Sequence, residues 1–151
     1  MHISARIPRI QLMAHIAVLG LGNWGTAIAR LWLLEGHNVK GWTIEQEVYE
    51  SIMMDGVNRK YLPDQSVEGL DVTMHLEEAM DGVEIVVLAI PSSVILNVVT
   101  DIIPHLRPGH VLLDLAKGLA PGKRLISEAI HEALREAGCS NPLAVLTGPT
   151  I

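Results

Sequence analysis

A glycine-rich segment, GLGNWG at residues 20–25, is the part of this sequence whose residue types and spacing point most directly to chemistry. Its pattern, G-x-G-x-x-G, follows the aliphatic run 16–19 and precedes an amphipathic stretch, as a turn between strand and helix would. Gly20 permits a tight turn, Gly22 lets the backbone approach a pyrophosphate, and Gly25 allows close helix–strand packing. The N-terminus of the following helix attracts phosphates through its free N–H groups and partial positive charge. The segment therefore predicts a dinucleotide-binding loop, the alternative being a glycine-rich turn that binds nothing.

An acidic residue about 20 positions after such a loop accepts hydrogen bonds from the adenosine ribose. Glu45 lies 20 residues past the last glycine, just beyond the second predicted strand. Thr43 and Ile44, which precede it, offer no cation to a 2′-phosphate, and Glu45 would repel one. We expect NAD or NADP as the cofactor with NAD favoured, unless Lys40 or Arg59 approaches from elsewhere.

The elements that must position these residues follow from an alternation of short aliphatic runs with amphipathic stretches, which is typical of βαβ units. Six strands are predicted, at residues 15–19, 38–42, 72–74, 83–89, 111–115 and 143–146. Helices are predicted at about residues 24–34, 45–54, 91–102 and 125–138. Ser92 and Ser93 are expected to cap the third of these helices. The expected fold class is α/β, with a Rossmann-type, doubly wound, mostly parallel sheet.

Composition limits the class of protein. Hydrophobic residues make up 49% of the sequence and Phe is absent, which suits a parallel sheet buried on both faces by aliphatic side chains. A net charge of −6 without a block of Lys or Arg argues against nucleic-acid binding. No apolar run approaches the ~18 residues of a membrane span. The single cysteine, Cys139, fits a reducing, cytoplasmic location.

Other catalytic patterns are absent from the sequence. The seven histidines form no i,i+4 pair and the sequence has one cysteine, so no metal site is predicted. No G-x-S-x-G nucleophile elbow occurs. Segment 118–124, GLAPGKR, has too few residues between its glycines for a P-loop, and Arg124 replaces the magnesium-binding Ser or Thr.

Residues 1–14 precede the first predicted strand. They carry Arg6 and Arg9 but no sustained apolar run, so they do not predict a secretory signal. We interpret residues 1–14 as a leader or an upstream mis-start. The dinucleotide-binding domain is expected to span residues 15–151.

Four further segments of the sequence indicate a particular protein family. After the glycine loop come NRKYLP at 58–63, AIPS at 89–92, AKGL at 116–119 and LTGPT at 146–150. In this order and spacing they resemble the N-terminal cofactor-binding domain of NAD(P)-dependent glycerol-3-phosphate dehydrogenases, which shows a GxGxWG loop, a YLP segment, a VPS strand end, a TKG turn and a final SGPSF or SGPTF. The resemblance covers about residues 15–151. It implies an oxidoreductase that interconverts sn-glycerol 3-phosphate and dihydroxyacetone phosphate, supplying glycerol phosphate for phospholipid synthesis.

The resemblance also implies roles for single residues. Lys117 matches a lysine that touches both cofactor and substrate, and Gly148 and Thr150 match substrate-contacting positions. A lysine after a central parallel strand lies at the carboxyl edge where ligands bind, and its ammonium could neutralise the substrate phosphate or polarise the carbonyl. The expected cofactor-binding residues are Gly20, Gly22, Asn23, Trp24, Gly25, Ile44, Glu45, Pro91 and Lys117.

The sequence departs from the family pattern at several points. Thr43 and Ile44 stand where the family has Gly and a basic residue suited to a 2′-phosphate, and Ile151 replaces the usual aromatic residue. The family's helical second domain, with its general-base lysine, has no counterpart within residues 1–151. No catalytic residue is therefore assigned here, and the chain alone is expected to lack turnover. A homo-oligomer, or an exposed apolar face for that second domain, is expected.

Two other interpretations stay open from the sequence. One is a different two-domain dehydrogenase of the ketopantoate reductase or nucleotide-sugar type, against which the Lys117 turn and the GPT ending at 148–150 argue. The other is a dinucleotide-binding module without turnover.

Overall fold

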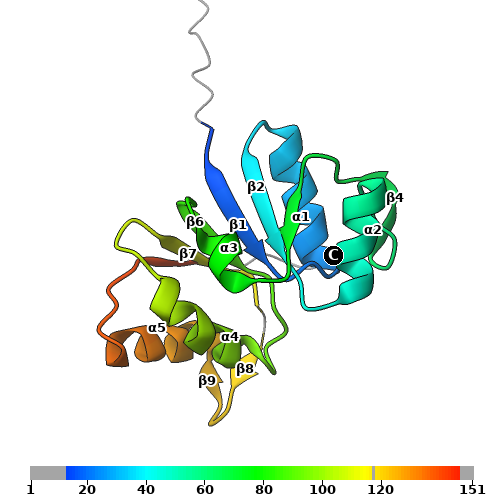
Figure 1. Ribbon diagram of the computed structural model, residues 1–151. Helices are drawn as coiled ribbons and strands as arrows, with labels where there is room; N and C mark the ends of the chain where they lie inside the picture. The colour runs from blue at the N-terminus through cyan, green and yellow to red at the C-terminus, as the bar shows by residue number, and fades with distance from the viewer. Residues whose placement is uncertain (1–12, 117, 147–151) are drawn as a thin grey trace, which may run out of the picture.

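The computed structural model describes residues 13–116 and 118–146, which form one α/β unit (Figure 1). The strands of its main sheet are β1 His15–Leu19, β2 Asn38–Trp42, β5 Asp71–Thr73, β6 Ile85–Leu88, β7 Val111–Asp114 and β10 Leu143–Val145. They are parallel throughout and lie in the order β10-β7-β6-β1-β2-β5. The chain starts in the middle of the sheet, moves to one edge, then crosses back and builds the other half. This is the doubly wound Rossmann order, so the predicted fold class is confirmed.

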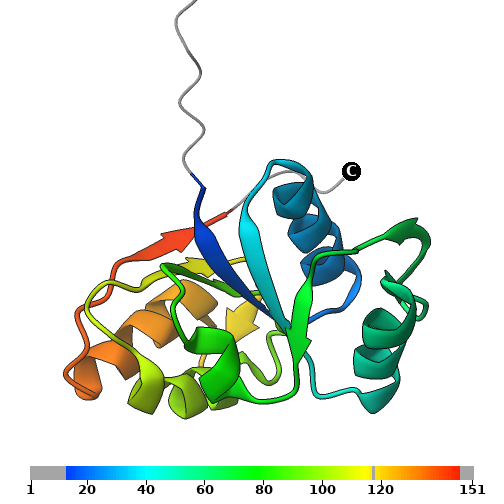
Figure 2. The same cartoon turned by 45° about the horizontal axis from the view of Figure 1, so that its top comes forward.

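Helices cover both faces of this sheet (Figure 2). They are α1 Asn23–Leu34, α2 Gln46–Asp55, α3 Leu76–Met80, α4 Ile95–Ile102, a 3-10 turn Ile103–His105, and α5 Ile126–Glu136. Two short antiparallel hairpins complete the described residues: β3 Val57–Asn58 with β4 Leu62–Ser66, and β8 Leu119–Ala120 with β9 Arg124–Leu125. Among these residues no helix combines the length and apolar character of a membrane span.

The central strand β1 shows why the sequence folds this way. Ile16 and Val18 face the core beneath α1 and α2, whereas Ala17 and Leu19 face the core beneath α3, α4 and α5. All four side chains are buried, because alternate residues of a strand point to opposite faces and both faces are covered. A continuous aliphatic run is therefore required, as the sequence predicted.

Several element boundaries differ from prediction. Helix α4 begins at Ile95 with Val94 as its N-cap, and no side chain caps it, so the prediction that Ser92 and Ser93 cap this helix is wrong. The backbone N–H groups of Val94 and Ile95 donate to the Pro91 carbonyl instead, which forms a turn before the helix. Strand β6 is shorter than the predicted 83–89 at both ends. The hairpins were not predicted.

Candidate dinucleotide-binding cleft

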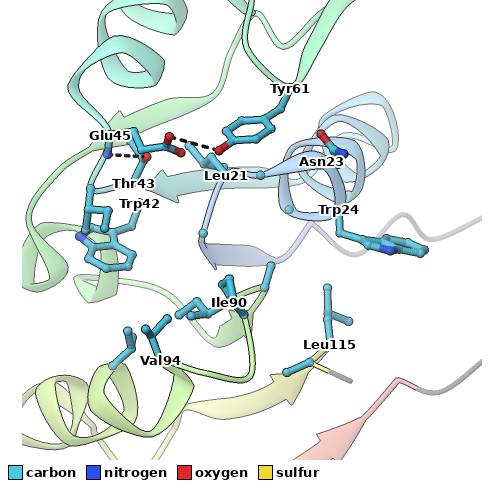
Figure 3. A pocket seen from close by; sticks show the side chains of 18 of the residues that line it. Leu21, Asn23, Trp24, Trp42, Thr43, Glu45, Tyr61, Ile90, Val94 and Leu115 are labelled. Carbon is cyan, nitrogen blue, oxygen red and sulfur yellow. Dashed lines mark hydrogen bonds between the residues drawn. The ribbon is translucent and has the colours of Figure 1, made fainter. Parts of the chain in front are cut away.

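The carboxyl ends of β1, β2, β6 and β7 meet at one edge of the sheet, and a cleft of about 710 Å³ opens there (Figure 3). Backbone hydrogen bonds join these strand ends: the Gly20 N–H donates to the Trp42 carbonyl at 2.9 Å, and the Ala89 N–H donates to the Leu19 carbonyl at 2.9 Å. The cleft therefore lies beside β1, where the strand order reverses. This is the position at which doubly wound sheets bind ligands.

Segments from both halves of the fold line this cleft. The lining residues are Gly20, Leu21, Gly22, Asn23, Trp24, Gly25, Trp42, Thr43, Ile44, Glu45, Tyr61, Ala89, Ile90, Pro91, Ser92, Val94, Val98, Leu115 and Ala116. Most of these described residues are apolar or are glycines that expose only backbone, and Glu45 is the one carboxylate among them. Eight of the nine residues expected to contact a cofactor are thus gathered in one cleft.

The three glycines of the loop differ in what a side chain would meet. At Gly20, whose φ is +104°, a Cβ atom would lie 2.3 Å from the Ala89 carbonyl oxygen. At Gly25 it would lie 1.8 Å from the Gly20 carbonyl oxygen. At Gly22, where φ is −78°, it would meet no atom within 4 Å. Two glycines are therefore required by the fold itself, and Gly22 is the one that leaves room for a ligand.

Helix α1 begins directly under this open position. Gly22 is its N-cap, no side chain among the described residues caps it, and no acidic residue occupies its first turn. Asn23 and Trp24 follow, and Trp24 is exposed. A helix start with this arrangement attracts an anion such as a pyrophosphate.

Glu45 lies in the turn after β2, as the N-cap of α2. Its N–H donates to the Thr43 hydroxyl at 3.1 Å, which fixes the turn after β2. Its Oε1 accepts hydrogen bonds from the Lys60 ammonium at 2.5 Å and from the Tyr61 hydroxyl at 3.1 Å. The Lys60 ammonium, aided by the Tyr61 hydroxyl and opposed by partial burial, holds the pKa of the Glu45 carboxyl below its ordinary value.

Glu45 also changes the pKa values of its two donors, Lys60 and Tyr61. Hydrogen bonds to Glu45 and to Glu47 raise the pKa of the Lys60 ammonium, which is therefore charged at neutral pH. The hydrogen bond to Glu45 and partial burial raise the pKa of the Tyr61 phenol, which stays protonated and keeps its donor. Glu45, the acid expected to bind the ribose, is therefore ionised, and both hydrogen bonds hold the same carboxylate oxygen, Oε1.

Asn58 connects the hairpin that carries these donors to the glycine loop. Its side chain is fully buried, and its Nδ2 donates to the Leu21 carbonyl at 2.9 Å and to the Thr26 hydroxyl at 2.8 Å. Its Oδ1 accepts the Tyr61 N–H at 3.2 Å. Asn58 thereby positions Leu21 and Tyr61, both of which line the cleft.

The opposite wall includes the turn that follows β7. Asp114 is buried there, and its Oδ1 accepts the Ala116 N–H at 2.8 Å. Burial raises the pKa of the Asp114 carboxyl, and the hydrogen bond from Ala116 partly offsets that rise. Lys117, Gly148 and Thr150, the residues expected to contact the substrate, lie outside the described residues.

Sequence patterns missed three residues of this region: Asn58, Lys60 and Tyr61. All belong to the NRKYLP segment, which entered only as a family resemblance. Lys40 and Arg59, the cations considered from the sequence, are engaged elsewhere: Lys40 donates to the carbonyls of Glu78 and Asp81, and Arg59 pairs with Asp55. No group of three His, Cys, Asp or Glu side chains that could hold a metal occurs in the described part of the chain.

Comparison with known proteins places this chain in a family. The family model described as the N-terminus of NAD-dependent glycerol-3-phosphate dehydrogenase matches residues 15–151. The glycerol-3-phosphate dehydrogenase (NAD(P)+) of Coxiella burnetii (strain Dugway 5J108-111) is 32% identical over 137 residues, which cover 90% of this chain and 40% of that protein. The enzyme of that name from Latilactobacillus sakei subsp. sakei (strain 23K) is 35% identical over 144 residues, covering 92% and 42%.

A solved structure agrees with these matches. The crystal structure of the glycerol-3-phosphate dehydrogenase from Coxiella burnetii has a TM-score of 0.82 with this chain, covering 92% of this chain and 42% of its own. The chain therefore spans about two-fifths of the length of the curated relatives it matches. Because the family match begins at β1 and includes every segment that lines the cleft, the chain belongs to the family of NAD-dependent glycerol-3-phosphate dehydrogenase N-terminal domains.

Proposed function

We propose that the chain binds a nicotinamide dinucleotide in the cleft and serves as the cofactor half of an enzyme that interconverts sn-glycerol 3-phosphate and dihydroxyacetone phosphate. The open space at Gly22 carries this proposal, because it lies at the uncapped start of α1 between two glycines that the fold itself requires. The pyrophosphate would lie against this loop, and Glu45 would accept hydrogen bonds from the adenosine ribose. The wall formed by Ala89–Pro91 and Leu115–Ala116 would face the nicotinamide.

The bound cofactor would supply hydride transfer, while the protein orients it and stabilises charge on the substrate. Lys117, Gly148 and Thr150 are proposed to form one wall of the substrate site, on the strength of the family motif. The Lys117 ammonium would neutralise the substrate phosphate or polarise its carbonyl. In the cell, the reaction would supply glycerol phosphate for phospholipids, in a cytoplasm whose reducing conditions suit the lone Cys139.

NAD is proposed as the preferred cofactor. Glu45 is ionised and faces the cleft, and a 2′-phosphate beside it would be repelled. Among the described lining residues no Lys or Arg occurs that would attract such a phosphate.

Cofactor binding is tested by titrating NADH into the chain and following nicotinamide fluorescence. Gly22→Val is expected to abolish binding with the melting temperature kept, because the backbone is extended there and a β-branched side chain fits it. Gly109→Val is the matched control, since a Cβ atom there also meets nothing within 4 Å and Gly109 lies outside the cleft. Unchanged NADH affinity in Gly22→Val would refute the proposed site.

Turnover is tested by NADH oxidation with dihydroxyacetone phosphate, in this chain and in a chain extended through any downstream reading frame. We expect turnover only in the longer chain, because a positioned acid–base group contributes roughly 10²–10⁴-fold and alignment of the reactants ~7–11 kcal/mol. That activity should be lost in Lys117→Ala. Turnover by the 151-residue chain itself would contradict the proposal, and NADH binding without turnover in either chain would favour a dinucleotide-binding module.

A further inference from the structure

Lys60 is a cation next to the proposed ribose site that no sequence pattern indicated. Its ammonium lies 2.5 Å from Glu45 Oε1 and 2.7 Å from Glu47 Oε1, so it bridges two carboxylates. It follows Asn58 in the β3–β4 connection, and the buried Asn58 side chain fixes that connection to the glycine loop. The backbone that carries Lys60 is therefore anchored beside the cleft.

Glu45 is held asymmetrically by its donors. Lys60 and Tyr61 both donate to Oε1, and no hydrogen bond from the described residues to Oε2 is found. Figure 3 shows the Glu45 carboxylate beside the Tyr61 hydroxyl, with a dashed line joining the two, and Glu45 lines the cleft. One oxygen is thus restrained while the other remains to accept ribose hydroxyls, which suits NAD.

The charges at this end of the cleft also disfavour a 2′-phosphate. Two carboxylates surround one ammonium, which leaves a net charge of −1 on the cluster. A phosphate monoester brings about −1.5 to −2 further charges at pH 7. Replacing the Glu45 carboxylate by an amide would make the cluster neutral and leave Lys60 with Glu47, two-thirds of whose side chain is exposed.

We propose that Lys60 is a restrained 2′-phosphate-binding cation, and that Glu45 sets the preference of the cleft for NAD over NADP by holding it. With Glu45 neutral, Lys60 would turn from the carboxylate oxygen to a phosphate oxygen at the same place, and the Tyr61 hydroxyl would remain as a second donor. Charge-assisted hydrogen bonds to phosphate are among the stronger ones in proteins. This inference rests on the proposed function, because it requires a dinucleotide in the cleft.

The two other cations considered from the sequence, Lys40 and Arg59, do not fit this role. Lys40 is held by the carbonyls of Glu78 and Asp81 at 3.1 and 2.7 Å, and Arg59 pairs with Asp55 at 2.7 Å. None of these partners lines the cleft. Lys60, by contrast, donates a hydrogen bond to Glu45, which lines the cleft.

The experiment measures the dissociation constants of NADH and NADPH by fluorescence titration at one fixed ionic strength, in the 151-residue chain. The variants are Glu45→Gln, Glu45→Gln with Lys60→Met, and Glu50→Gln. The last is the matched control, because it also removes one carboxylate from the α2 region but has Gln46, not Lys60, as its partner. Circular dichroism and melting temperature verify that each variant is folded.

Wild type is expected to bind NADH more tightly than NADPH. Glu45→Gln should shift the ratio of the two constants toward NADPH by roughly tenfold or more, as one charge-assisted hydrogen bond to phosphate would do. The added Lys60→Met should reverse that gain, and Glu50→Gln should leave the ratio within about twofold.

Three results would overturn the inference. If wild type binds NADH and Glu45→Gln leaves the ratio unchanged, Glu45 does not set the preference. If the gain persists after Lys60→Met, Lys60 is not the cation. In both cases the proposed function stands, whereas a wild-type chain that binds neither dinucleotide overturns the proposed function together with the inference.

Discussion

Replacing Asn58 by alanine tests whether the β3–β4 hairpin is fastened to the glycine loop through this one side chain. The substitution removes three hydrogen bonds at 2.9, 2.8 and 3.2 Å from a fully buried position. Each bond contributes about 0.5–1.5 kcal/mol net, and the Leu21 carbonyl and the Tyr61 N–H each lose a partner. We expect the free energy of unfolding to fall by about 2–4 kcal/mol, which for a chain of this length lowers the melting temperature by roughly 5–15 °C.

The assay is urea unfolding followed by far-UV circular dichroism, with NADH titration below the transition. Affinity for NADH is expected to weaken as well, because Asn58 positions Leu21 and Tyr61 at the cleft. Asn97→Ala is the matched control, since Asn97 is exposed on α4 and lies outside the cleft. A loss below about 1 kcal/mol in Asn58→Ala, or an equal loss in Asn97→Ala, would refute the reasoning.

Three more predictions concern stability. Burial lowers the pKa of His110 below its ordinary 6.5, so just below that pH the unfolded chain binds more protons than the folded chain, and the free energy of unfolding falls on acidification. His110→Gln should make the free energy of unfolding, measured by urea titration, depend less on pH. A pH dependence equal to that of the wild type would contradict this prediction. Burial raises the pKa of Asp114, so its carboxylate destabilises the fold above that pKa. Asp114→Asn keeps an acceptor for the Ala116 N–H and should raise the melting temperature at pH 7. A lower melting temperature would count against this prediction. Gly25→Ala should destabilise by about 3 kcal/mol or more in the same urea assay, because its Cβ would overlap the Gly20 carbonyl; stability equal to that of Gly109→Ala would argue otherwise.

The strands of the main sheet were predictable because each strand depends on the residue types of its own segment. Strands β1 and β2 match their predicted bounds. For β1, burial on both faces requires the aliphatic run that the sequence shows. In β2 only Val39 and Gly41 are buried, and Gly36 marks the turn before the strand. The start of α4 was not predictable in the same way. Ser92 has the right type for a cap, but the Pro91 carbonyl forms a turn first, and only the folded backbone shows which of the two occurs.

The residues of the site also differ in whether local sequence patterns could predict them. Gly20, Gly22 and Gly25 and the acid Glu45 follow from spacing along one βαβ unit, where distance in sequence fixes distance in space. Lys60 and Tyr61 reach Glu45 from a hairpin 15 and 16 residues away. That contact depends on buried hydrogen bonds over a separation of 32 and 37 residues, which no local pattern encodes.

The two walls of the cleft belong to opposite halves of the chain: the glycine loop lies near residue 20, and the last lining residue in the described part of the chain is Ala116. A partly folded chain with only its first βαβ unit in place would have the loop and Glu45 but no opposite wall. Ligand binding is thus a readout of complete folding. A dinucleotide in the cleft would act as a non-covalent crosslink between the halves, adding about 2.7 kcal/mol to the free energy of unfolding at a hundred times its dissociation constant. The lifetime of this protein in a cell would then depend on how much cofactor surrounds it.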